Sequence, residues 1–165
     1  MKGMISVATG EVWATAKRIV LRSDGIGSCV VVAAYDKGHR VGALAHVMLP
    51  GKSSKSGFGY NTKYARDAIE EMLFKMTRLG ADGGSLEACI VGGANVLQDG
   101  DDTLCPNLVN FVIGNLQEKR IKIVAQAVGG TTGRSVMFDI DEGAVYYAQG
   151  EGSAALLHTW GPYDG

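Results

Sequence analysis

The segment from residue 29 to residue 49, CVVVAAYDKGHRVGALAHVML, contains two apolar runs joined by a short polar turn. Residues 29–35 are small or β-branched, which is typical of a strand covered on both faces. Residues 36–40, DKGHR, favour a chain reversal, and residues 41–49 return as a second strand that Pro50 and Gly51 close. The pattern predicts a hairpin whose first strand lies in the centre of a sheet.

Two helices follow this hairpin in the sequence. The first is predicted over residues 62–79, because apolar residues recur there at helical spacing. These residues are Ala65, Ala68, Ile69, Met72, Leu73, Met76 and Leu79. Asn61 or Thr62 can cap its start, and Gly80 suits its end. A second helix is predicted to begin near Pro106, since proline is tolerated in a first turn. Its buried residues should be Val109, Val112, Ile113 and Leu116.

Further strands are predicted on both sides of the helices. Two short ones lie within residues 4–22, before a turn at 23–28, and others cover 86–91 and 121–128. A final hairpin joins 135–140 to 144–148, and residues 51–59 form a surface loop. We therefore expect an α/β fold: one layered, mixed β-sheet or sandwich domain with two main helices, over residues 1–150. The tail, 151–165, is rich in small residues and is predicted to be poorly ordered.

Composition limits the class of partner. The 165 residues suffice for one domain with its own core, and 17 acidic residues nearly balance 16 basic ones. Such a balance argues against nucleic acid or an anionic membrane as the main partner. The sequence shows neither a secretory signal pattern nor a bilayer-spanning run, so we expect a cytoplasmic protein without membrane insertion. Three dispersed cysteines would be free thiols in that compartment.

Cys29 is the first candidate for chemistry, because it follows Gly25-Ile26-Gly27-Ser28 at the start of an apolar strand. Glycines permit backbone conformations in which amide N–H groups converge on one point. The amides around Gly27 and Ser28 could thus form an oxyanion hole beside the thiol. The alternative is that Cys29 is a small core residue at the start of a strand.

His46 and Ser23 are the candidate partners of that thiol. His46 lies in the second strand of the hairpin, on one face with Leu44 and Met48. Beside Cys29, its imidazole could take the thiol proton. A hydroxyl such as that of Ser23 could then orient the ring. The alternatives are a histidine that is bonded to a backbone carbonyl and a turn serine that is bonded to its own backbone.

The order of several segments resembles the CheD family of chemoreceptor glutamine deamidases over residues 4–148. The matching segments are Gly27-Ser28-Cys29-Val30, residues 42–50 (GALAHVMLP), residues 64–69 (YARDAI), Gly92-Gly93-Ala94, Asn107, residues 121–125 (IKIVA) and residues 128–134 (VGGTTGR). The sequence departs from the family at three places. Serine stands at position 23, where threonine is usual. Residues 104–107 keep only the asparagine of a Gly-x-Arg-Asn pattern, and Gln126-Ala127 lacks a common acidic residue.

The resemblance implies a CheD-like fold and a catalytic triad of Cys29, His46 and Ser23, with no cofactor and no metal. The implied reaction is hydrolysis of glutamine side-chain amides to glutamate on methyl-accepting chemotaxis receptors. The same nucleophile could also hydrolyse receptor methyl esters. A second hypothesis is a non-catalytic adaptor that binds receptors and regulates a CheC-type phosphatase. The departures near residues 104–107 and 126–127 motivate it.

Overall fold

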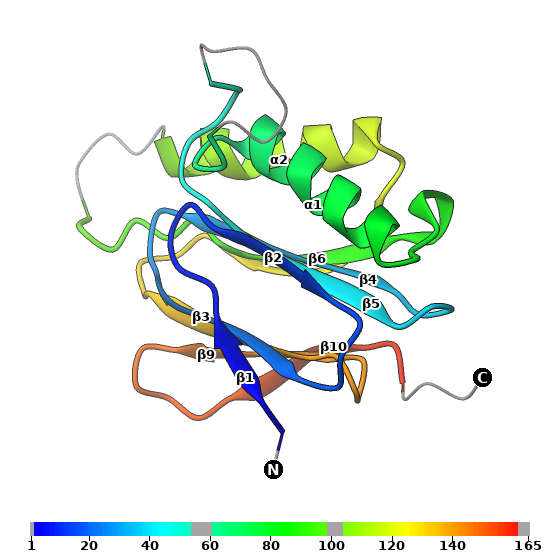
Figure 1. Ribbon diagram of the computed structural model, residues 1–165. Coiled ribbons are helices and arrows are strands. Elements are labelled where there is room, and N and C mark those ends of the chain that lie inside the picture. Colours follow the sequence, from blue (N-terminus) through cyan, green and yellow to red (C-terminus); the bar gives the residue numbers. More distant parts are fainter. Residues whose placement is uncertain (1, 54–60, 99–103, 162–165) are drawn as a thin grey trace.

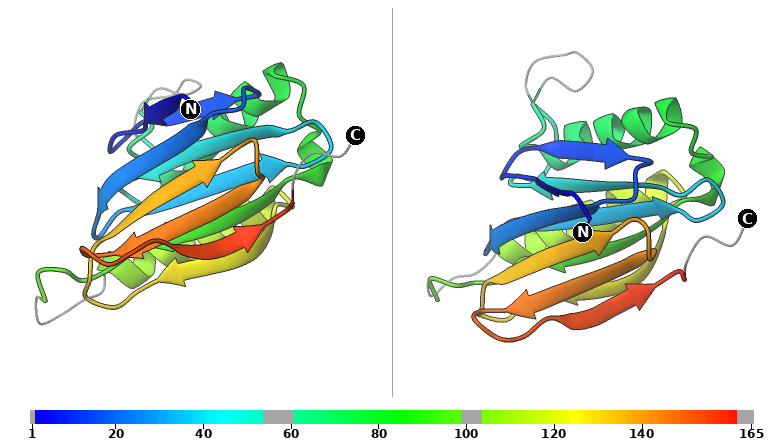
Figure 2. Two further views of the ribbon diagram at one scale, coloured as in Figure 1. Left: turned by 90° about the horizontal axis from the view of Figure 1, so that it is seen from below. Right: turned by 60° about the horizontal axis from the view of Figure 1, so that its bottom comes forward.

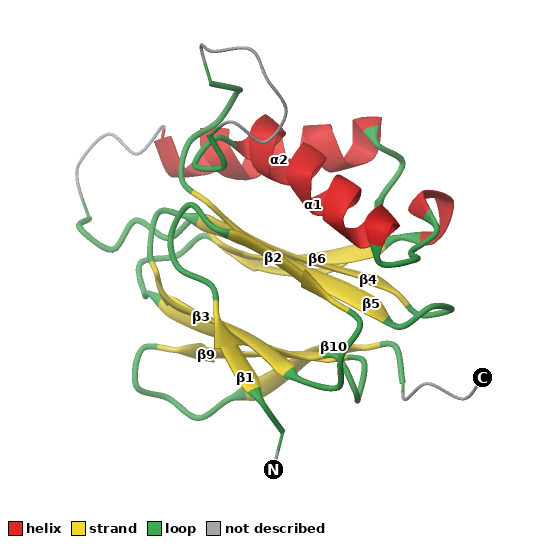
Figure 3. Ribbon diagram, in the orientation of Figure 1, coloured by secondary structure: helices red, strands yellow, loops and turns green. Residues whose placement is uncertain are grey.

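The computed structural model describes residues 2–53, 61–98 and 104–161. Most of the predicted surface loop at 51–59 lies outside these ranges. The described chain forms three layers, with two helices above one five-stranded sheet and a second five-stranded sheet below it (Figures 1 and 3). The predicted α/β class and its layered, mixed sheets with two helices are confirmed.

The sheet beneath the helices contains the predicted hairpin at its centre. Its strand order is β2-β5-β4-β6-β7. The strands span Val12–Thr15 (β2), Val30–Asp36 (β4), Val41–Val47 (β5), Glu87–Gly92 (β6) and Lys122–Val128 (β7). Every residue of β4 and β5 is buried, as expected for strands covered on both faces. Only β6 and β7 pair in parallel, because the second helix connects them as a crossover.

The other sheet gathers strands from both ends of the chain. Its order is β1-β3-β8-β9-β10. The strands span Met4–Ser6 (β1), Val20–Ile26 (β3), Arg134–Asp139 (β8), Ala144–Gln149 (β9) and Ala155–Thr159 (β10). Figure 2 shows this sheet from below, lying across the face of the hairpin that the helices leave uncovered. The two layers pack closely at Gly42, where a Cβ would lie 2.4 Å from the Ile140 side chain and 3.0 Å from that of Phe138 in β8.

The helices cover the upper face of the first sheet. α1 spans Ala65–Arg78, and α2 spans Leu104–Glu118. A 3-10 turn, η1, spans Gly83–Ser85. Tyr64, rather than Asn61 or Thr62, precedes α1 as its N-cap and makes no side-chain capping bond. Gly80 follows the helix with φ of 102°, a left-handed conformation that glycine adopts without strain, as predicted.

Two regions differ from the sequence-based expectation. The predicted turn at 23–28 is strand as far as Ile26, and its pairing with β8 shifts register between Ser23 and Ile26. The polar, glycine-containing stretch between these two residues therefore forms a β-bulge. The tail also differs, since β10 pairs with β9 and Trp160 stacks against Tyr35 at 5.0 Å between ring centroids. These aromatic contacts anchor a segment whose small residues suggested poor order.

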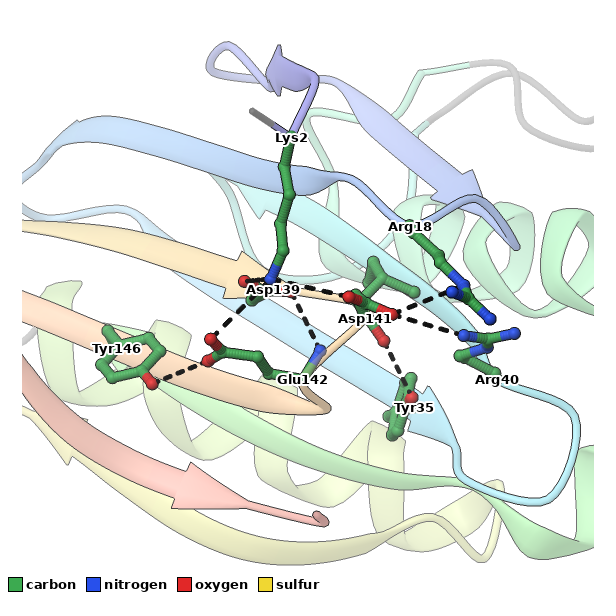
Figure 4. Close-up of polar contacts among 9 residues, drawn as sticks. Lys2, Arg18, Tyr35, Arg40, Asp139, Asp141, Glu142 and Tyr146 are labelled. Carbon is green, nitrogen blue, oxygen red and sulfur yellow. Dashed lines mark hydrogen bonds and ion pairs between the residues drawn. The ribbon is translucent and has the colours of Figure 1, made fainter. Parts of the chain in front are cut away.

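A network of ion pairs closes one end of the two sheets (Figure 4). Lys2 donates to Asp139 at 2.6 Å, and Arg40 lies 3.4 Å from Asp141. The Tyr35 hydroxyl donates to the Ile140 carbonyl at 3.0 Å. The network therefore joins the N-terminus and both sheets, at the end of β4 remote from Cys29.

Neither of the described helices is long and apolar enough to cross a lipid bilayer.

Candidate functional site

Cys29 lies in the bend of residues 27–29 that connects β3 to β4, with its side chain half-buried. The bend is held from the side by the segment that follows β6. Gly93 N donates to the Cys29 carbonyl at 2.8 Å, and Ala94 N donates to the Gly27 carbonyl at 2.9 Å. A strand start that is fixed in this way presents the thiol in a defined position. Sequence reasoning identified the bend but missed the segment that holds it.

Gly92 fits this contact because it lacks a side chain. Its φ is 129°, and a Cβ at this position would lie 2.2 Å from the Cys29 carbonyl oxygen. No real Cβ approaches an oxygen so closely, so any other residue would push the bend away from β6. The Gly92-Gly93 pair was noted in the sequence, but only the strand pairing reveals its contact with Cys29.

The amide N–H groups of the bend are available for a substrate. Within the described residues, no backbone carbonyl accepts a hydrogen bond from Ser28 N or Cys29 N. Ser28 is exposed, and the Gly27 main chain is anchored through its carbonyl. Free N–H groups on an anchored backbone can stabilise a developing oxyanion.

His46 lies in β5 and is 1% exposed. Neither ring nitrogen has a hydrogen-bond partner among the described residues. Burial lowers the pKa of the ring, and the nearby Val7 carbonyl only partly opposes that shift. His46 is therefore neutral near pH 7, which is the form that can accept a proton. The Val7 carbonyl lies near enough to act on the pKa of the ring, so the alternative of a histidine that faces a backbone carbonyl stays open beside the catalytic one.

The strand register predicts that Cys29 and His46 lie on the same side of their sheet. His46 pairs directly with Val31 in the antiparallel β4–β5 ladder. Side chains at paired positions point to one face, and residues two apart on a strand share that face. Cys29 lies two residues before Val31, in the bend just outside the ladder, and continuing the strand alternation to residue 29 predicts a position diagonal to His46. Such positions are about 7–8 Å apart at Cα and within reach of long side chains.

The Cys29 thiol and the His46 ring are both shifted toward their uncharged forms. Burial raises the pKa of the Cys29 thiol, while burial lowers that of the imidazole. Charge separation in a half-buried site is costly. Burial thus favours a neutral Cys29 thiol and a neutral His46 imidazole in the folded protein.

Ser23 faces the same layer from the other sheet. It is 1% exposed and pairs with Val136 of β8, whose side chain is part of the core between the sheets. Its hydroxyl donates to the Val7 carbonyl at 2.6 Å. That same carbonyl acts on the pKa of His46. The contact recorded for Ser23 is thus with Val7, not with the ring, and no sequence signal pointed to Val7.

An apolar side chain borders the bend on its exposed side. The Cγ2 of Val96 lies 3.4 Å from the position of a Cβ on Gly27, and Val96 is 45% exposed. Among the described residues, no three His, Cys, Asp or Glu side chains gather as metal ligands would. The arrangement is that of a thiol, a buried base and free amides, which can perform nucleophilic acyl transfer.

The chain is similar to proteins of one family. A family model described as CheD chemotactic sensory transduction matches residues 48–149, a range that begins after Ser23, Cys29 and His46. A protein of Chlorobium luteolum, named probable chemoreceptor glutamine deamidase CheD, is 35% identical over 92% of this chain and 76% of its own length. A protein of the same name from Archaeoglobus fulgidus is 38% identical over 91% of this chain and 97% of its own length. The chain therefore belongs to the CheD family.

Proposed function

We propose that this protein deamidates glutamine side chains of chemotaxis receptors in the cytoplasm. The single observation that supports the proposal is the register of the β4–β5 hairpin, in which the buried His46 pairs with Val31, two residues after Cys29. The names of the curated relatives supply the substrate class, since they are called chemoreceptor glutamine deamidases. The proposal assigns this reaction to the Cys29 site.

The reaction begins with a proton transfer and an attack. His46 takes the thiol proton of Cys29 as the sulfur forms a bond to the amide carbon of glutamine. The carbonyl oxygen becomes an oxyanion, which the N–H groups of Ser28 and Cys29 stabilise. The C–N bond then breaks, and ammonia leaves with the proton that His46 returns. The product of this half-reaction is a thioester on Cys29.

Water completes the turnover. His46 takes a proton from water as the oxygen attacks the thioester carbon, and the C–S bond breaks. The proton returns to the sulfur, and the receptor retains a glutamate. A methyl ester has the same reactive carbonyl group, with methanol as the leaving group. The proposed activity therefore includes hydrolysis of receptor methyl esters by the same steps. The Val7 carbonyl, held by Ser23 Oγ, can accept the N–H of the imidazolium and orient the ring.

The test uses a receptor fragment and intact-mass spectrometry. Each conversion of an amide to an acid raises the fragment mass by about one dalton. We expect the wild-type protein to cause this shift and Cys29→Ala to abolish it, while Cys105→Ala, which removes another buried thiol, retains it. Deamidation by Cys29→Ala at the wild-type rate would overturn the assignment of the nucleophile.

Binding to a CheC-type phosphatase is a second candidate function, carried by exposed apolar residues near the site. Leu97 is 82% exposed and Leu104 is 55% exposed, both in the connection from β6 to the start of α2. Val96, which borders the Cys29 bend, belongs to the same connection. A partner that covers Val96 would also lie against the Gly27–Cys29 bend. We expect Leu97→Ser to weaken phosphatase binding in calorimetry and to leave Cys29 alkylation unchanged; unchanged binding would remove this candidate.

A further inference from the structure

Arg134 is a buried cation beside the nucleophile bend that the mechanism above does not use. It begins β8 and pairs with Ile26, three residues before Cys29. Its side chain is 9% exposed. Val136 and Phe138, at alternate positions of the same strand, both belong to the core between the sheets. Arg134 therefore points into the layer between the sheets, at the end where Cys29 lies.

In the part of the chain that the structure describes, the guanidinium of Arg134 has no carboxylate partner. Among the described residues, no acidic side chain lies within ion-pair distance of it, and its Nε has no hydrogen-bond partner. Its recorded polar contact is Nη1, which donates to the Gly92 carbonyl at 3.4 Å. Burying an unpaired charge costs stability, and an apolar side chain of similar size would be a better choice for packing alone.

The contact with Gly92 connects Arg134 to the nucleophile. The Gly92 carbonyl also accepts a bond from Gly129 N at 3.0 Å. The next two amides along the chain, of Gly93 and Ala94, hold the carbonyls of Cys29 and Gly27. Because Gly92 packs directly against the Cys29 carbonyl, a small rotation of its peptide group would move the bend and the free N–H groups of Ser28 and Cys29.

We propose that Arg134 is a positioning residue for the oxyanion hole of the reaction proposed above, on which this inference rests. Its guanidinium fixes the Gly92 carbonyl, and the Gly93 and Ala94 amides transmit that position to the Gly27–Cys29 bend. Arg134 does not touch the substrate. It keeps the bend amides aligned for the tetrahedral intermediate, in which the oxygen charge develops.

The test compares two reactions of the same thiol. Deamidation needs the oxyanion hole, whereas alkylation of Cys29 by iodoacetamide is a direct displacement that forms no oxyanion. We expect Arg134→Met to lower kcat for a receptor fragment by about 10- to 100-fold, with KM within about twofold, because the donors lose alignment but are not removed. The rate of Cys29 alkylation should stay within about threefold, because the thiol and His46 are untouched.

Matched variants separate positioning from folding. Arg134→Lys retains a charged donor and should recover part of the lost kcat, and Ser135→Ala, at the neighbouring position of β8, should behave as wild type. If Arg134→Met fails to fold, Arg134→Gln is measured in the same way. Alkylation that falls in parallel with kcat, or an unchanged kcat in a folded variant, would overturn the inference. The Cys29→Ala arm tests the proposed function separately, since it removes the nucleophile and leaves Arg134 in place.

Discussion

The two ends of strand β4 treat buried polar groups in opposite ways. At its far end Asp36 is 1% exposed, and its carboxylate accepts bonds from His39 Nδ1 at 2.8 Å and Asp82 N at 2.7 Å. Near its other end, about 17 Å away along an extended strand, Val31 of β4 pairs with His46 of β5, and both ring nitrogens of His46 have no partner among the described residues. One end of the β4–β5 hairpin is saturated with hydrogen bonds, and the other is left incomplete.

This difference means that one end of the hairpin stabilises the fold, whereas the other end holds the groups proposed for the reaction. A buried polar group without a partner costs about 1–3 kcal/mol, so the end near Cys29 weakens the fold. The saturated end, with its ion pairs around Asp139 and Asp141 (Figure 4), offsets that cost. Unpaired donors and acceptors are available to a substrate, whereas paired ones are not. The contrast predicts that substitutions at the two ends affect different measurements.

The largest effect is expected for His46→Leu. Loss of the general base should lower the deamidation rate by about 10²–10⁴-fold. The free energy of unfolding at pH 7.5 should remain equal or rise, because an apolar side chain replaces two unpaired nitrogens among buried neighbours. Product mass and urea denaturation measure the two quantities. Wild-type activity in this variant would show that His46 is not the base.

The same variant has a distinct pH signature. Burial lowers the pKa of His46 in the folded state, so as pH falls below about 6.5 the unfolded chain binds a proton that the folded chain does not. The wild type should therefore lose stability from pH 7 toward pH 5, and His46→Leu should lose less. Ser135→Ala, which changes no titratable group, serves as control and should lose stability as the wild type does. An equal loss in both proteins would contradict the burial of a neutral imidazole.

A smaller effect, on stability alone, is expected for Asp36→Asn. Loss of the charge weakens several hydrogen bonds, so the free energy of unfolding should fall by about 1–3 kcal/mol at pH 7. The pKa of Asp36 is held below its usual value by the Asp82 amide and by His39, which outweigh burial. This stabilisation is present above about pH 4 and disappears as pH falls through the folded pKa, so the variant and the wild type should converge in acid.

The control for Asp36→Asn is Asp24→Asn, which removes an exposed carboxylate paired with Arg22. It should change stability by less than about 1 kcal/mol. Deamidation per folded molecule should stay at the wild-type level in both variants. A selective loss of kcat in Asp36→Asn would show that the far end also takes part in the chemistry.

The smallest effect is expected for Ser23. Ser23→Ala removes the bond to the Val7 carbonyl, which should cost about 1 kcal/mol of stability and about tenfold in kcat through a less constrained His46. Ser23→Thr retains the hydroxyl and should restore both quantities. Steady-state deamidation kinetics with thermal unfolding provide the measurements. If Ser23→Ala matched the wild type in kcat, Val7 and Ser23 would have no orienting role.

The sequence predicted the parts of the fold that depend on local patterns. The hairpin of residues 29–49 and both helices are confirmed, because their apolar residues repeat with a clear period over many positions. β3 extends through Asp24 and Gly25, which resemble a turn locally, since a partner strand more than 100 residues away supplies the pairing. β10 was missed for a different reason, since its partner is the neighbouring β9 and the small residues of the tail suggested poor order.

The candidate site was partly predictable. Cys29, His46 and Ser23 were selected from their residue types and neighbours, and their roles remain proposals. The contacts of Arg134, which lies in the quoted segment 128–134, and those of Val7 were not foreseen because they depend on strand pairings between distant segments. No local motif marks a carbonyl that accepts a serine hydroxyl. Only the assembled sheets reveal which backbone groups face the thiol.

The most direct test of the central claim is to map iodoacetamide adducts by peptide mass while deamidation is followed in the same sample. We predict that Cys29 is labelled first and that activity falls in proportion to its labelling. Labelling should accelerate as pH rises above 7, because the resting thiol is neutral. Cys89, buried with its pKa raised to about 12, should remain unlabelled. Full alkylation of Cys29 with undiminished deamidation would contradict the account.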